Sequence, residues 1–229
     1  MAFDLSRHPR VDGRRRATEP CVWKPEELSV REAITLLGNR LGELMSRDSS
    51  YARVKVLVAC GDASLMAAGR FAYSYKARLS AWQMMAELEG AAAEDVIRAY
   101  KMKLSGEVLL VEFSELRAAV EAFLFRVAPT NEPLNGDRMI SIFRTHWERE
   151  GAPTRSHDRL IDRLGWLIRG RRQFGLPQAS RLVARGGRWL ESDTYASVFL
   201  AFIDTTTGGD LDSSITRQPT LRSWRAFCY

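Results

Sequence analysis

Residues 29–45, SVREAITLLGNRLGELM, predict a helix, its first residue and its buried face. Ser29 and Glu32 have the spacing of a capping box, in which each side chain accepts a hydrogen bond from a backbone N–H of the first turn. Apolar residues then recur every three or four positions, which gathers them on one face of the helix: Val30, Ala33, Ile34, Leu37, Leu41, Leu44 and Met45. A helix with such a face packs against a core.

The same spacing of apolar residues recurs along most of the chain. It predicts a long helix that begins at Asp62 and ends before Gly90, and another helix over 91–104. Ser114 is expected to cap the next helix, which Pro129 stops. Further helices are expected at 137–147, 156–168 and 177–185, and residues 195–203 fit either a helix or a strand.

Two segments in the first half of the chain also fit short strands. Residues 54–58, VKVLV, are rich in β-branched side chains, and residues 107–113 are an apolar run between carboxylates. Each segment precedes a helix, an arrangement that can bind a nucleotide, but neither carries a GxGxxG or P-loop motif. The predicted fold class is therefore mainly α with two helical lobes, and the alternative gives the first lobe two short strands.

Composition divides the chain into an arm, two helical regions and a tail. Residues 1–24 contain turn residues and a basic run and are expected to form a flexible basic arm. The turn-rich sequence TNEPLNGD at 130–137 separates a core domain at 25–128 from an Arg-rich helical domain at 138–203. Residues 204–229 are expected to be a loop-like tail. Its aromatic residues, which could dock back onto the body, are Trp224, Phe227 and Tyr229.

Positive charge is concentrated at the two ends of the sequence. Residues 1–24 hold six Lys/Arg and three Asp/Glu, residues 25–128 hold thirteen and fourteen, and residues 129–229 hold fifteen and eleven. Residues 155–188 alone hold nine Arg and two Asp. The guanidinium group is a planar fork suited to phosphate. A GC-rich genome, which favours Arg codons whatever the function, is the alternative explanation.

Within 155–188, the arginines at 155, 159 and 163 and those at 181, 185 and 188 have helical spacing, and three more lie in the basic connector between these helices. The two rows predict a surface of guanidinium groups that follows a phosphate backbone. Three aromatic residues among them, Trp166, Phe174 and Trp189, are suited to stacking on bases. Asp158 and Asp162 neutralise part of one row, so a solvated charged face is the alternative. The predicted nucleic-acid-binding residues are Arg14, Arg15, Arg16, Arg155, Arg159, Arg163, Arg169, Arg171, Arg172, Arg181, Arg185 and Arg188.

Three other functions compete with this prediction. Residues 164–192 partly resemble a helix-turn-helix module, although Arg181 and Leu182 are one residue out of register for it. A small α/β transferase-type enzyme would use the strand–helix units, but none of the three His residues has a nucleophile at a suitable spacing. A protein-interaction or oligomerisation module would use the apolar seam over 65–82 as its interface.

The remaining signals exclude several classes of protein. The three Cys residues form no CxxC pair, there is no HExxH motif, and no cofactor or metal is predicted. No apolar stretch is long enough for a membrane span, and the N-terminus lacks a secretory pattern, so we expect an intracellular protein, cytoplasmic or nuclear. The favoured function is non-enzymatic binding of RNA or DNA, as in a nucleocapsid-like or regulatory protein of a virus or mobile element.

Overall fold

The computed structural model describes residues 28–86, 91–106, 110–129, 135–149, 190–207, 220–221 and 224–225. Their regular structure is helical throughout, which confirms the mainly α prediction, and no strand occurs in these ranges. The helices are α1 (Val30–Ser46), α2 (Ser50–Ala67), α3 (Tyr75–Ala86), α4 (Ala91–Ser105), α5 (Phe113–Val127), α6 (Gly136–Arg149) and α9 (Leu190–Thr207). Residues 220–221 and 224–225 are also helical.

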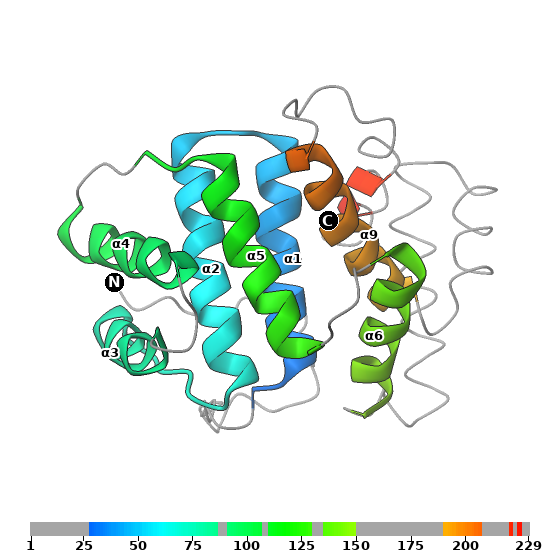
Figure 1. Cartoon of the computed structure of the whole chain (residues 1–229), viewed down its shortest axis with the longest axis horizontal. Coiled ribbons are helices and arrows are strands. Elements are labelled where there is room, and N and C mark those ends of the chain that lie inside the picture. The colour runs from blue at the N-terminus through cyan, green and yellow to red at the C-terminus, as the bar shows by residue number, and fades with distance from the viewer. Residues whose placement is uncertain are drawn as a thin grey trace, which may run out of the picture.

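The helices form three groups that lie side by side (Figure 1). α1, α2 and α5 occupy the middle, with α3 and α4 packed on the side of α2 and α6 and α9 packed on the side of α1. α1 begins as the capping box predicts, because Ser29 Oγ accepts from the Glu32 N–H and Glu32 Oε2 accepts from the Ser29 N–H.

α2 overturns the strand predicted at 54–58. Val54, Val56, Leu57 and Val58 are all buried within this helix, although consecutive helical residues face different directions. α2 is covered by α1, α3, α4 and α5, so apolar residues surround it on almost every side. A helix buried in this way loses the amphipathic period that identifies a helix in a sequence, and its β-branched residues then resemble a strand.

The long helix predicted from Asp62 to Gly90 is also wrong, because Asp62 lies inside α2 and the chain leaves the helix after Ala67. Gly69 has a φ of 64°, its N–H donates to the Met66 carbonyl, and the Arg70 N–H donates to the Leu65 carbonyl. These two bonds form a Schellman motif, a common helix end that needs glycine in the left-handed region. α3 then starts anew after the turn.

α5 begins at Phe113, one residue before the predicted cap at Ser114. Glu112 is the N-cap residue, and its N–H donates to Glu115 Oε2 at 3.0 Å. Residues 110–112 carry no strand. A carboxylate near the N-terminus of a helix is favoured by the helix dipole, so Glu112 and Glu115 both stabilise the start of α5.

α9 settles the ambiguity at 195–203 in favour of a helix and extends to Thr207, into the segment expected to be a loop. Trp224 docks onto α1, as its aromatic character suggested, and it is buried. Its ring lies against Gly42, where a Cβ would have no room, while Tyr195 of α9 lies against Gly38 in the same way. Phe227 and Tyr229 lie outside the described residues.

Aromatic rings join α5, α6 and α9. Phe199 stacks on Phe123 with ring centroids 6.2 Å apart and meets Phe143 edge-on at 5.3 Å. Trp147 of α6 continues the cluster toward Tyr195 of α9. Offset and edge-to-face pairs of this kind add to the free energy gained from apolar burial. The division into domains at 130–137 stays a prediction, as do the 1–24 arm and the limits of the domains at 25–128 and 138–203.

Candidate nucleic-acid interface

Every residue predicted to contact nucleic acid lies outside the described residues: Arg14, Arg15, Arg16, Arg155, Arg159, Arg163, Arg169, Arg171, Arg172, Arg181, Arg185 and Arg188. Almost all of the helix-turn-helix segment at 164–192 lies there too. The described helices show instead how the cations of the helical body are used.

Most arginines of the body that form ion pairs join one helix to another. Arg31 of α1 binds Glu191 of α9 at 2.6 Å, and Arg98 of α4 binds Glu115 of α5 at 2.8 Å. Arg144 of α6 binds Asp193 through two nitrogens, with Nε to Oδ1 at 2.8 Å and Nη2 to Oδ2 at 2.6 Å. Such two-point contacts are specific to the guanidinium group. These arginines hold helices together, so their charge is largely matched within the protein.

Asp62, Arg78 and Tyr100 form a buried polar cluster between α2, α3 and α4. Asp62 Oδ1 accepts from the Tyr100 hydroxyl at 2.6 Å, and Oδ2 lies 2.9 Å from Arg78 Nη1. Arg78 also donates to the Ala72 and Tyr73 carbonyls, so it fixes the turn before α3. Burial raises the pKa of Asp62, against the opposing effects of Arg78 and Tyr100. Three helices enclose the cluster, and its hydrogen bonds join these helices to one another.

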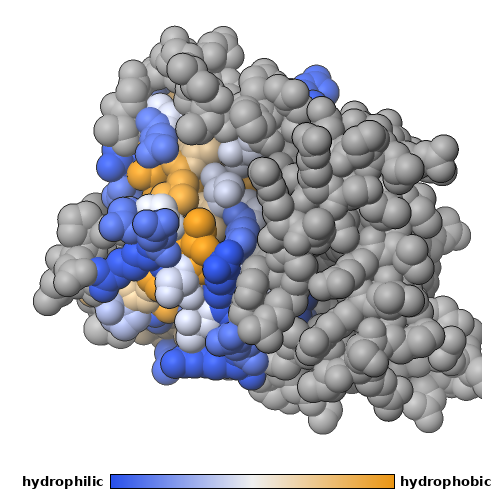
Figure 2. Space-filling model, turned by 90° about the vertical axis from the view of Figure 1, so that its right-hand side faces the viewer, coloured by the Kyte–Doolittle hydropathy of each residue, from blue (hydrophilic) through white to orange (hydrophobic). Residues whose placement is uncertain are grey.

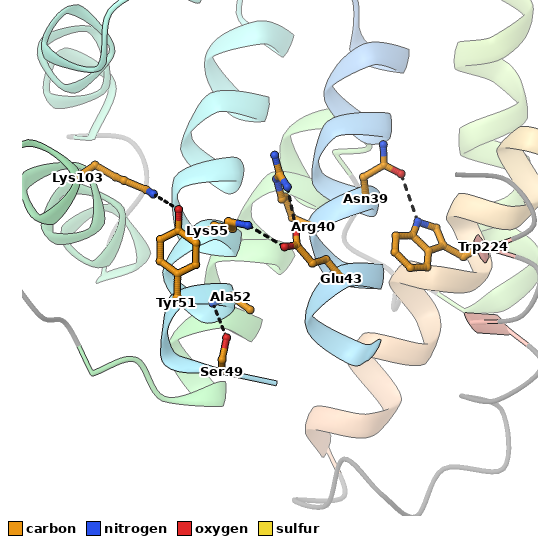
Figure 3. Close-up of polar contacts among 9 residues, drawn as sticks. All are labelled: Asn39, Arg40, Glu43, Ser49, Tyr51, Ala52, Lys55, Lys103 and Trp224. Carbon is orange, nitrogen blue, oxygen red and sulfur yellow. Dashed lines mark hydrogen bonds and ion pairs between the residues drawn. The ribbon is translucent and has the colours of Figure 1, made fainter. Parts of the chain in front are cut away.

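A different arrangement lies at the first turn of α2, where Tyr51 is flanked by two lysines (Figure 3). Lys103 of α4 donates from Nζ to the Tyr51 hydroxyl at 3.2 Å, and this Nζ lies 4.5 Å from the centre of the phenol ring. Lys55 Nζ lies 4.8 Å from the same centre. The aromatic ring attracts both ammonium groups through its quadrupole.

Two cations in this region share one carboxylate. Glu43 Oε1 lies 2.7 Å from Lys55 Nζ, and its Oε2 lies 2.7 Å from Arg40 Nη1. Among the described residues, no carboxylate lies within ion-pair distance of Lys103. The pKa of the Tyr51 hydroxyl is lowered by the hydrogen bond from Lys103 and then by the charge of that lysine. Tyr51 is 57% exposed, so this positive region is open to solvent.

The described residues offer few groups for catalysis or metal binding. His146 Nε2 is 3.1 Å from the Val127 carbonyl oxygen, and burial raises the pKa of the Cys60 thiol, which makes it unreactive. No group of three metal-binding side chains occurs in the described ranges. His8, His157, Cys21 and Cys228 lie outside them. The α/β units of the transferase alternative are absent from the same ranges, since 54–58 is helical.

Figure 2 shows the face of the molecule on the side of α6 and α9. On its coloured part, apolar surface is interrupted by hydrophilic side chains (Figure 2). In the described part of the protein, no helix is both long and apolar enough to cross a bilayer.

The cluster around Tyr51 was not predicted from the sequence. Lys103 is 52 residues from Tyr51, and no periodic pattern reports a contact over such a separation. The only hint in the sequence is that lysine is rare, with five in the chain. Two of these five lie beside Tyr51. Comparison with protein families, with curated proteins and with solved structures finds no match to this chain.

Proposed function

We propose that this protein binds nucleic acid without sequence specificity and without catalysing a reaction. Arginines in 155–188 contact phosphates, and Arg14, Arg15 and Arg16 of the arm add affinity. The observation that supports this most directly is the ratio of nine Arg to two Asp within 155–188. Counterions released when such groups bind a phosphate backbone provide a large favourable term at low salt.

The ion pairs of the helical body strengthen the argument by contrast. There, carboxylates such as Asp193, Glu115 and Asp48 already hold the arginines of the body. In 155–188, by contrast, two Asp can balance at most two of the nine Arg. A GC-rich genome explains a high Arg content in general, but it does not explain why charge is balanced over 25–128 and unbalanced in 155–188.

Contacts to phosphate do not distinguish RNA from DNA or one sequence from another. We therefore expect the protein to bind both, in the cytoplasm or nucleus, as a nucleocapsid-like or regulatory protein of a virus or mobile element does. Self-association on the nucleic acid would fit a packaging role. We propose no membrane partner and no cofactor.

A protein-interaction module is the second candidate, and exposed apolar side chains near α3 favour it. Tyr73 is 63% exposed and Met84 is 70% exposed. Large apolar side chains on a surface mark interfaces when they are contiguous. The predicted seam over 65–82 is not one continuous helical face, however, because the chain turns between α2 and α3. Measuring the molar mass of the protein in solution, alone and with nucleic acid, separates the two candidates.

The direct test is binding of the full chain to a labelled single strand and to a labelled duplex at low salt. The proposal expects binding to both, with little effect of sequence. Absence of binding to either, with a self-associated protein in solution, would instead favour the interaction module.

A further inference from the structure

Tyr51 has a hydrogen-bond donor that no described residue accepts. Its oxygen accepts from Lys103 Nζ, which leaves its own hydrogen able to donate to a further acceptor. An ammonium group has three donors, and Lys103 uses one of them on Tyr51. Lys55 Nζ likewise donates to Glu43 and keeps further donors. The exposed phenol of Tyr51 and the two lysines beside it therefore all keep unused donors (Figure 3).

The charges of this group favour an anion. Lys55 Nζ and Lys103 Nζ lie 4.8 Å and 4.5 Å from the centre of the Tyr51 ring, so both positive charges flank the same exposed phenol. Glu43 pairs with Lys55 and with Arg40. Its single negative charge does not balance Arg40, Lys55 and Lys103 together, so positive charge remains to attract an anion beside the phenol. Lysine is a common ligand for phosphate because it offers a compact charge and rotatable donors.

We propose that Tyr51, Lys55 and Lys103 form a binding site for a phosphate group. The two ammonium groups donate to phosphate oxygens, and the Tyr51 hydroxyl donates to a third while its own oxygen keeps the bond from Lys103. The site is made of residues of α2 and α4, none of which belongs to 155–188, so it goes beyond the proposed function. The phosphate of a nucleic-acid backbone and that of a small phosphate compound share this chemistry.

Lys101 provides a matched control. It lies on α4 two residues before Lys103, so its side chain leaves the helix in a different direction, and it is exposed. Lys101→Gln and Lys103→Gln remove the same charge from the same helix. A difference in phosphate affinity between the two variants is therefore due to the position of the lysine, because both variants lose the same net charge.

The experiment is an NMR titration of the full chain with inorganic phosphate, with sodium chloride at equal ionic strength as a reference. Tyr51→Phe identifies the Tyr51 ring signals. The proposal expects a saturable shift of these signals with phosphate, and an affinity about five- to tenfold weaker in Lys103→Gln, as losing a charge-assisted hydrogen bond would produce. Lys101→Gln should behave as the wild type does. No saturable shift, or equal affinities of the two lysine variants, would overturn the proposal.

A second arm identifies the source of the phosphate. If the site binds a nucleic-acid backbone, Lys103→Gln also weakens binding of a short thymidine oligonucleotide. If the site binds small phosphate compounds, only the titration with inorganic phosphate responds. Changing Arg169, Arg171 and Arg172 to Ala should leave the phosphate shift of Tyr51 intact in either case. If the wild type shows the phosphate shift but does not bind the oligonucleotide, the proposed function fails and this site stands. If the phosphate shift is absent, this site fails whatever the oligonucleotide result.

Discussion

Nε1 of Trp224 lies 3.2 Å from Oδ1 of Asn39, and this contact fixes a segment near the end of the sequence to the first helix. The same Asn39 oxygen accepts from the Tyr195 hydroxyl at 3.0 Å. One amide of α1 therefore holds both α9 and the C-terminal segment. Gly38 and Gly42, one turn apart on α1, leave the space in which the two rings lie.

Replacing Asn39 with Ala should lower the free energy of unfolding by about 1–3 kcal/mol, because two aromatic donors lose this acceptor within a largely buried contact. Urea denaturation followed by tryptophan fluorescence measures the change. Trp224→Phe, which keeps an aromatic ring but removes the donor, should cost less than Asn39→Ala. An Asn39→Ala variant as stable as the wild type would show that this amide does not anchor the two rings.

Gly61 should not tolerate a side chain, because α4 crosses α2 closely at this residue. A Cβ there would lie 2.6 Å from Val96 Cγ1 and 2.8 Å from the Tyr100 hydroxyl oxygen. We expect Gly61→Ala to destabilise the protein by about 1–3 kcal/mol, the usual cost of overpacking a core. Gly136→Ala is the control, since its Cβ would meet only Leu200, at 3.7 Å. That variant should be neutral or more stable by up to about 1 kcal/mol, the difference in helix propensity. Similar losses in both would contradict the packing argument.

Asp62 should make stability depend on pH in a particular direction. Because burial raises its pKa in the folded protein, the folded state binds a proton more readily than the unfolded state does. The stability of the wild type relative to Asp62→Asn should therefore fall as pH rises from about 4, the ordinary pKa of Asp. The fall should end above the raised pKa. Denaturation of both proteins over a pH series measures this difference, in which other titrating groups largely cancel. A difference that grows with pH would show that the Arg78 ion pair outweighs burial.

The sequence predicted helices well where one face is apolar and the other polar. α1 begins at its capping box, and α5 and α6 bury the residues that their spacing selects, such as Phe123, Phe143 and Trp147. Prediction failed in α2, where burial on almost all sides removes the period. It also missed the turn at Gly69, although a glycine that follows an apolar helical run is a known signal for a Schellman motif.

The candidate interface was less predictable than the fold. The contact of both Lys55 and Lys103 with Tyr51 depends on how α2 and α4 pack, and no local pattern encodes that contact. The arginines of 155–188 are the reverse case, because their spacing and charge are plain in the sequence. Charge composition predicts a class of partner, whereas tertiary contacts are needed to place an individual binding group.

The measurement that tests the proposed function most directly is the salt dependence of binding to a labelled single strand. Wild type is compared with a variant in which Arg169, Arg171 and Arg172 are all Ala, and with a control in which Arg47, Arg117 and Arg138 of the helical body are Ala. The proposal predicts a steep loss of affinity with salt for wild type and for the control. The slope should be shallower for the first variant by up to about 0.7 for each phosphate contact removed. No binding at low salt, or equal slopes for all three proteins, would contradict phosphate binding by the arginines of 155–188.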